Sequence, residues 1–149
     1  MESKVIPNDV LFETAGGFIA EGKSVLFIPE GRSMLPFIRG GRDSVVLTRP
    51  SAPLEVGDIV LARAGGRYVV HRIRAVEGDE VTLMGDGNLR GKEKCTTGDV
   101  IGIVTEIVKP GGRRVKPGKG FLWRKLLPTR RLLLAVLKRT VFIEDYRNP

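Results

Sequence analysis

The chain of 149 residues has few of the features that stabilise extracellular or membrane-spanning proteins. Its single cysteine, Cys95, excludes an internal disulfide and a cysteine-rich metal site. The longest apolar run, residues 132–137, is six residues long, whereas a membrane-spanning helix needs ~18. The N-terminus, MESKVIPNDV, has no apolar segment of the kind found in secretory signals. We therefore expect a cytoplasmic protein that consists of one globular domain with appended segments and binds no metal or other cofactor.

Acidic residues are scarce in the last part of the chain. Residues 109–149 contain 12 Lys or Arg but only 2 Asp or Glu, whereas residues 1–108 contain 13 and 15. The net charge of +8 therefore belongs to the tail. This asymmetry favours peripheral contact between residues 121–143 and an anionic membrane, at its inner face. Nucleic acid is not the expected partner, because the tail has one Trp and no recognition motif. The sequence makes no prediction of oligomeric state.

Apolar periodicity predicts a mainly β domain over residues 1–108. A short helix is expected within residues 8–21, where apolar side chains recur at helical spacing. Runs of β-branched residues bounded by Gly, Asp or Asn predict a β core over residues 24–108. The expected strands lie within residues 24–28, 44–48, 57–65, 67–76, 79–88 and 98–108. Residues 109–120 are rich in Gly, Pro and basic residues, which predicts a linker or a terminal hairpin.

Residues 121–149 predict a basic amphipathic helical tail. Its apolar side would carry Leu132, Leu133, Val136, Leu137, Thr140, Val141 and Ile143. This side could dock on the β domain, or it could lie in a membrane interface with Trp123 at the level of the lipid headgroups.

His71 is the only histidine of the chain and lies in the expected strand 67–76. Alternation places it on the apolar face with Val69 and Ile73, so that Arg72 and Arg74 face away. A histidine at such a position is either a hydrogen-bonded core residue or a general base, because a neutral imidazole accepts a proton near neutral pH.

The following hairpin offers this histidine a carboxylate. A turn centred on residues 78–79 would pair Val76 with Val81 and Ile73 with Met84, and would set His71 opposite Asp86. A carboxylate at one ring nitrogen selects the tautomer whose other nitrogen can accept a proton. A one-residue bulge would instead put the carboxylate on the opposite face of the sheet.

Ser33 lies in the stretch GRSMLPF, residues 31–37. A serine between Gly and Pro is typical of a turn in which the hydroxyl bonds its own backbone. The alternative is a nucleophile, which requires a base within hydrogen-bond reach. Spacing in the sequence does not by itself bring Ser33 and His71 together.

Five segments in fixed order resemble the S24/S26 serine peptidases, the group of signal peptidases and LexA-like self-cleaving repressors. They are GRSMLPFIRGGRDSVVL, LEVGDIVLA, YVVHRI, LMGDGN and GDVIGIV, and the resemblance covers about residues 24–108. The resemblance implies a compact domain of coiled antiparallel sheets and a serine endopeptidase that cleaves a peptide or protein. It implies Ser33 as the nucleophile and His71 as the base, as in the Ser-His type of the group.

The resemblance leaves the third catalytic group open. Lys92 stands where the Ser-His type has an Asp, so the partner of His71 is Asp86, Glu93 or no carboxylate at all. Signal peptidases commonly carry a second Ser two positions before the nucleophile, where this chain has glycine. The backbone N–H groups of Ser33 and Met34 are then expected to hold the oxyanion.

Two other readings remain open for the β domain. Without the hydrophobic anchor of signal peptidases or the DNA-binding domain of LexA-like proteins, we expect a stand-alone form of the fold. A non-catalytic module that binds peptides by strand addition is the alternative to a peptidase. A Cys95-His71 pair is a further catalytic alternative, although no motif supports the thiol.

Overall fold

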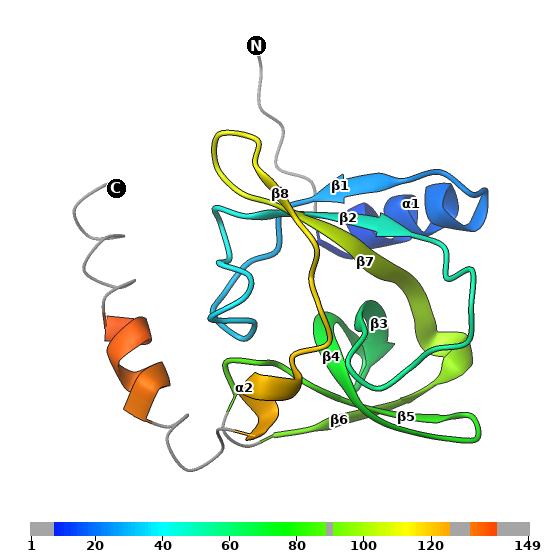
Figure 1. Ribbon diagram of the computed structural model, residues 1–149. Helices are drawn as coiled ribbons and strands as arrows, with labels where there is room; N and C mark the ends of the chain where they lie inside the picture. Colours follow the sequence, from blue (N-terminus) through cyan, green and yellow to red (C-terminus); the bar gives the residue numbers. More distant parts are fainter. Residues whose placement is uncertain (1–7, 89–90, 126–131, 140–149) are drawn as a thin grey trace.

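The computed structural model describes residues 8–88, 91–125 and 132–139. Helix α1 (Asn8–Ala20) precedes a curled sheet of eight antiparallel strands (Figure 1). The strands are β1 (Val25–Phe27), β2 (Ser44–Thr48), β3 (Ile59–Ala64), β4 (Arg67–Glu77), β5 (Glu80–Met84), β6 (Glu93–Thr96), β7 (Val100–Val108) and β8 (Arg114–Val115). The 3-10 helix η1 (Thr97–Asp99) joins β6 to β7, and the helices α2 (Phe121–Lys125) and 132–139 follow β8. The predicted mainly β class is confirmed.

Strand β7 joins the two halves of the sheet. The strand order is β1-β2-β7-β3-β4-β5-β6, and β8 also pairs with β7. The register of β7 shifts against β2 between Val46 and Leu47, and against β3 between Leu61 and Ala62. Such irregularities bend strands and increase their twist, which accounts for the curl of the sheet (Figure 1).

Strand β3 separates two apolar cores. Ile59 and Leu61 pack on one side with Ile19 of α1, and Val60 and Ala62 pack on the other side. Because side chains alternate along a strand, a β3 buried on both faces is apolar at nearly every position. The two cores fix the strands on which the candidate site is built.

Residues 109–120 form a packed hairpin rather than a free linker. Val115 of β8 pairs with Ile107 of β7. The carbonyl oxygen of Gly118 accepts a hydrogen bond of 2.9 Å from Arg72 Nη1, and Lys119 forms an ion pair with Asp58. This segment therefore covers the face of β4 that carries Arg72.

The C-terminal helices contact the β domain through two buried side chains. Trp123 of α2 and Leu134 of the helix 132–139 form a small apolar cluster with Leu35, against which Phe37 packs. Leu134 is only 1% exposed, although the sequence did not assign it to the apolar side of the tail. The tail thus docks on the domain, but through a different residue than predicted.

The predicted apolar side of the tail faces outward. Leu132 and Leu133 are exposed, and the predicted positions 140, 141 and 143 lie outside the described residues. Across the described part of the chain, every helix is too short or too polar to span a bilayer.

Candidate active site

Ser33 lies in a tightly bonded turn between β1 and β2. The amides of Phe37 and Ile38 both donate to the carbonyl oxygen of Met34, at 3.0 Å each. Met34 and Ile38 are buried in the core beside α1. Gly31 has a φ of 84°, a conformation that side chains other than glycine rarely adopt. The turn therefore presents the half-buried Ser33 from a fixed backbone.

The imidazole of His71 is held by Glu93. Nδ1 of His71 lies 3.0 Å from Oε2 of Glu93, and both side chains are largely shielded from water. When the Nδ1–H donates to this carboxylate, Nε2 is left as the acceptor. Arg67 Nη2 lies 3.6 Å from the other oxygen of Glu93 and helps to hold the carboxylate. Of the carboxylates that the sequence left open, Glu93 is the one that contacts His71.

The predicted register of the hairpin was wrong beyond its first pairs. Val76 pairs with Val81 as expected, but the register shifts between Ile73 and Ala75, so that Ile73 pairs with Leu83. Arg72, rather than Ile73, then pairs with Met84. The extra residue is a β-bulge, which moves every later side chain by one position.

Gly85 allows His71 to reach past the end of β5. A Cβ atom on Gly85 would lie 3.1 Å from His71 Nε2 and 2.3 Å from the carbonyl oxygen of Ser33. The second distance is shorter than any real contact, so any larger residue would displace the Ser33 turn. The absent side chain lets Nε2 of His71 and the backbone oxygen of Ser33 both lie close to this glycine.

Asp86 binds Arg72 and not His71. Arg72 Nε donates to Oδ1 and Nη2 donates to Oδ2 of Asp86, each at 2.8 Å, and both residues are buried. Arg72 Nη1 also donates to the carbonyl oxygen of Gly57 at 2.8 Å. The sequence predicted that Arg72 faces away from the apolar side. It is nevertheless buried, because the segment that contains Gly118 and Gly120 covers it.

The ion pair holds the loop that supports the Ser33 turn. The amide of Gly87 donates to the carbonyl oxygen of Ser33 at 2.7 Å. The indole N–H of Trp123 donates to the backbone oxygen of Asp86 at 2.9 Å. Asp86 is therefore a structural residue that links β4, the Ser33 turn and α2.

The amides of Ser33 and Met34 donate no hydrogen bond to any described residue. Unpaired amides near a nucleophile can stabilise an oxyanion, as predicted for these two. Among the described residues, the Ser33 hydroxyl and the imidazole of His71 are also not hydrogen-bonded to each other. Such bonds are often long without substrate and tighten when it binds.

Two adjoining hollows lie beside Ser33. The smaller, of about 30 Å³, is lined by Ser33, Met34 and Val70 among others. The larger, of about 250 Å³, is lined by apolar side chains that include Phe12, Phe27 and Tyr68. Pro29, Glu30 and Val70 line both. A chain bound along this surface would meet a small apolar site next to Ser33 and a larger one farther away.

Cys95 is a poor alternative to Ser33. It is buried in β6, and burial followed by the charges of Asp99 and Glu93 raises the pKa of its thiol. A raised pKa lowers the thiolate fraction and hence the nucleophilicity. No three His, Cys, Asp or Glu side chains among the described residues are arranged to hold a metal ion.

Sequence reasoning missed strand β6. Its sequence EKCT alternates, with Glu93 and Cys95 turned inward and Lys94 and Thr96 exposed. That pattern of period two was the available signal. Recognising it would have placed the Glu93 side chain on the inner face before the structure was known.

Comparison with protein families matches residues 6–108 to the family described as Peptidase S24-like. A search among curated proteins found no match. The family match covers α1 and the strands β1 to β7, which include Ser33, His71 and Glu93. Over most of its length, the chain therefore belongs to the S24-like peptidase family and has the fold of a serine peptidase.

Proposed function

We propose that the protein is a serine endopeptidase in which Ser33 is the nucleophile, His71 the general base and Glu93 the group that orients the base. One observation carries this proposal: Glu93 holds Nδ1 of the imidazole, while Nε2 lies beside Gly85 and the Ser33 turn. A serine hydroxyl is a weak nucleophile until a base removes its proton. The second nitrogen of His71 is the group that we assign as this base.

The reaction is an acyl transfer. Ser33 Oγ forms a bond to the scissile carbonyl carbon while its proton moves to His71 Nε2, and the carbonyl oxygen becomes an oxyanion. The amides of Ser33 and Met34 donate to that oxyanion. The carbon–nitrogen bond then breaks as the protonated imidazole gives its proton to the leaving amine. Water then attacks the acyl ester while His71 Nε2 takes its proton. The protonated imidazole returns that proton to Ser33 Oγ as the ester bond breaks.

The substrate is a peptide or an extended protein segment. Strand β1 lies at an edge of the sheet and leads directly to the Ser33 turn. An extended chain can add to such an edge through backbone hydrogen bonds. The hollow of about 30 Å³ next to Ser33 favours a small side chain at the cleavage position.

A non-catalytic peptide-binding module is the second candidate. It is favoured by the lack of a hydrogen bond between the described Ser33 hydroxyl and His71, together with the edge position of β1. Both functions use the same surface, so binding alone does not separate them. Cleavage does.

The test incubates the full chain with a proteome-derived peptide library and identifies new peptide ends by mass spectrometry. We expect cleavage after small residues, abolished in Ser33→Ala and in His71→Ala. Ser51→Ala, which changes an exposed serine, should cleave as wild type does. Cleavage that persists in Ser33→Ala would refute the peptidase. Retention of peptides without cleavage by the wild type would favour the binding module.

A further inference from the structure

Exposed leucines cover the outer side of the C-terminal helices. Leu122 of α2 is 80% exposed, and Leu132 of the helix 132–139 is 71% exposed. Leu133, beside it, is exposed as well. The neighbouring Trp123 and Leu134 are buried and hold the two helices on the domain. The exposed leucines are therefore presented on docked helices, and we call Leu122, Leu132 and Leu133 the leucine surface.

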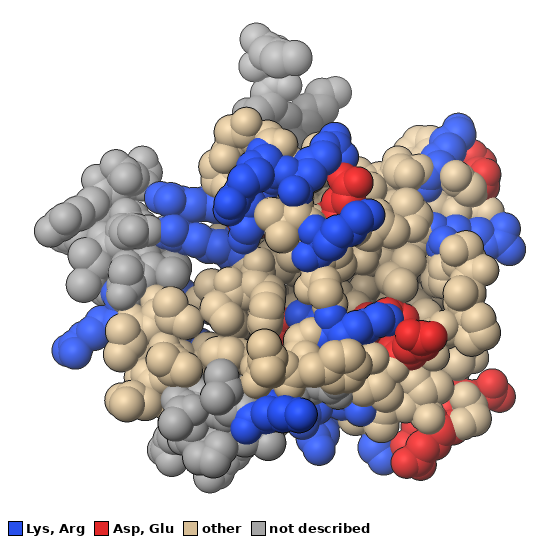
Figure 2. Space-filling model, viewed as in Figure 1, with Lys and Arg blue, Asp and Glu red and all other residues tan. Residues whose placement is uncertain are grey.

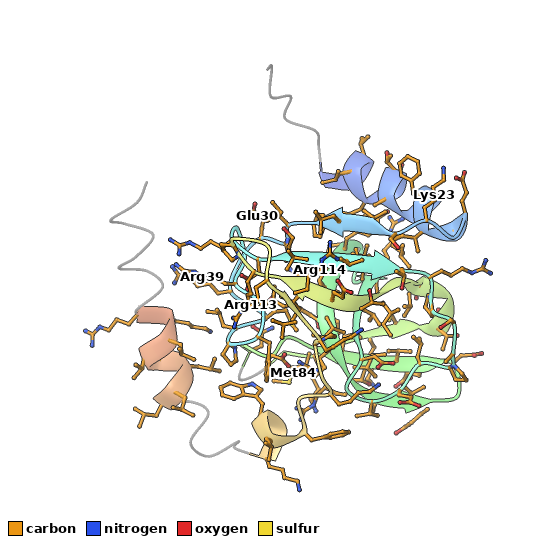
Figure 3. All side chains as sticks on the ribbon, turned by 45° about the horizontal axis from the view of Figure 1, so that its top comes forward. Lys23, Glu30, Arg39, Met84, Arg113 and Arg114 are labelled. Carbon is orange, nitrogen blue, oxygen red and sulfur yellow. The ribbon has the colours of Figure 1, made fainter. Side chains whose placement is uncertain are left out.

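Exposed Lys and Arg lie on the two helices that carry the leucine surface. The sequence beyond residue 108 has 12 Lys or Arg and 2 Asp or Glu. Lys125 and Arg139, on the same two helices, are exposed. On the face drawn in Figure 2, Lys and Arg lie at several places across the surface, and those toward the left have no Asp or Glu visible beside them. Figure 3 shows Arg39 extending on the side of the helix 132–139.

We propose that the leucine surface and the exposed Lys and Arg of these helices form a docking site for an anionic membrane. Aliphatic side chains flanked by cations enter the boundary between headgroups and acyl chains, and anionic headgroups attract the cations. Nucleic acid would match the charge but not the leucines, because single strands are held by aromatic side chains that stack on bases. The only Trp is buried and bonded to Asp86, which leaves Phe121 as the one exposed aromatic side chain described on these helices. A single ring does not form a stacking platform for successive bases.

Docking would fix the orientation of the Ser33 turn relative to the bilayer. Trp123 bonds the loop that contains Asp86, and Leu134 packs in one cluster with Leu35 of the Ser33 turn. The leucine surface and the turn therefore belong to one rigid arrangement. The membrane affinity itself does not depend on the proposed peptidase activity.

The test is co-sedimentation of the full chain with vesicles. We expect binding to vesicles of phosphatidylglycerol and phosphatidylcholine, and much weaker binding to phosphatidylcholine alone or at high salt. Leu122→Glu and Leu132→Glu should each weaken binding about tenfold, since each loses apolar burial and adds a negative charge. Leu26→Glu changes a leucine of β1 that is 64% exposed, and should bind as wild type does. Circular dichroism verifies that each variant is folded.

Two further measurements separate docking from its alternatives. Ser33→Ala should bind the vesicles unchanged, whether or not the peptidase proposal holds. The emission of Trp123 should not shift on addition of vesicles, because its indole is already buried. Absence of binding to anionic vesicles, equal binding by Leu132→Glu, or a blue shift of the emission would overturn the proposal. Tighter binding to duplex DNA than to vesicles would also overturn it.

Discussion

Exchanging Asp86 for Asn tests the division of roles between the two carboxylates. Asn keeps the shape of the side chain but loses its charge, and its amide nitrogen would face the donor Nη2 of Arg72. The guanidinium would then remain buried without a counter-ion. Removing one partner of a buried pair costs about 3–5 kcal/mol. Because Asn still accepts one hydrogen bond, we expect a loss of about 3 kcal/mol in the free energy of unfolding.

The assay is urea or thermal unfolding, followed by the emission of Trp123, which bonds the backbone of Asp86. For a domain of this size, a loss of about 3 kcal/mol lowers Tm by about 6–12 °C. At a temperature at which the variant is folded, any loss of cleavage should come only from loosening of the loop that supports Ser33.

Glu93→Gln is the matched variant with the opposite expectation. Its side chain contacts His71 at the edge of the domain, so the free energy of unfolding should fall by only about 1 kcal/mol. The Gln amide can donate to Nδ1 and favours the tautomer with its proton on Nε2. Cleavage should therefore fall by about 10²–10⁴-fold. If Asp86→Asn unfolded like wild type but lost cleavage, while Glu93→Gln kept it, the assignment of roles would be refuted.

Three further changes probe the surroundings of the site. Gly85→Ala should abolish cleavage and lower Tm, because its methyl group would overlap the carbonyl of Ser33; full activity in a peptide assay would contradict the geometry. Because burial raises the pKa of the Cys95 thiol, labelling by a disulfide reagent at pH 8 should be far slower in the folded protein than after denaturation; equal rates would contradict its burial. Trp123→Phe should keep most of the apolar packing but lose the bond to the loop, which lowers the free energy of unfolding by about 1 kcal/mol. Denaturant titration followed by circular dichroism measures that loss, and an unchanged midpoint would show that the bond contributes nothing.

Most of the strands could be predicted from the sequence because each is a run of apolar or alternating residues between turn residues, whereas β6 was missed. The partner of His71 could not be predicted, because it depends on one bulge. The alternating pattern of β4 does not indicate that Arg74 is an extra residue in the pairing with β5. That extra residue nevertheless decides whether Asp86 or Gly85 lies alongside His71. Register is set by three-dimensional packing as much as by pattern.

The burial of Arg72 and Leu134 was equally hidden from the sequence. Each is buried by a segment that lies far away in the sequence. Arg72 is covered by the segment that contains Gly118, and Leu134 packs against Leu35. Arg72 looks like a solvent-facing charge until the hairpin beyond β7 is folded over it. Helical periodicity placed Leu132 and Leu133 on the apolar side of the tail but left out Leu134, because which leucine meets the domain depends on the surface opposite.

The path of residues 118–123 over Arg72 has a practical consequence for where the folding unit ends. The family match stops at the end of β7. The buried guanidinium of Arg72, however, also donates to the carbonyl oxygen of Gly118, which lies beyond that point. Gly120 approaches the guanidinium so closely that a Cβ atom would lie 2.9 Å from Arg72 Cζ. A chain that ended at residue 108, where the family match stops, would leave the buried guanidinium of Arg72 uncovered. We therefore expect the smallest stably folded unit to extend through Trp123.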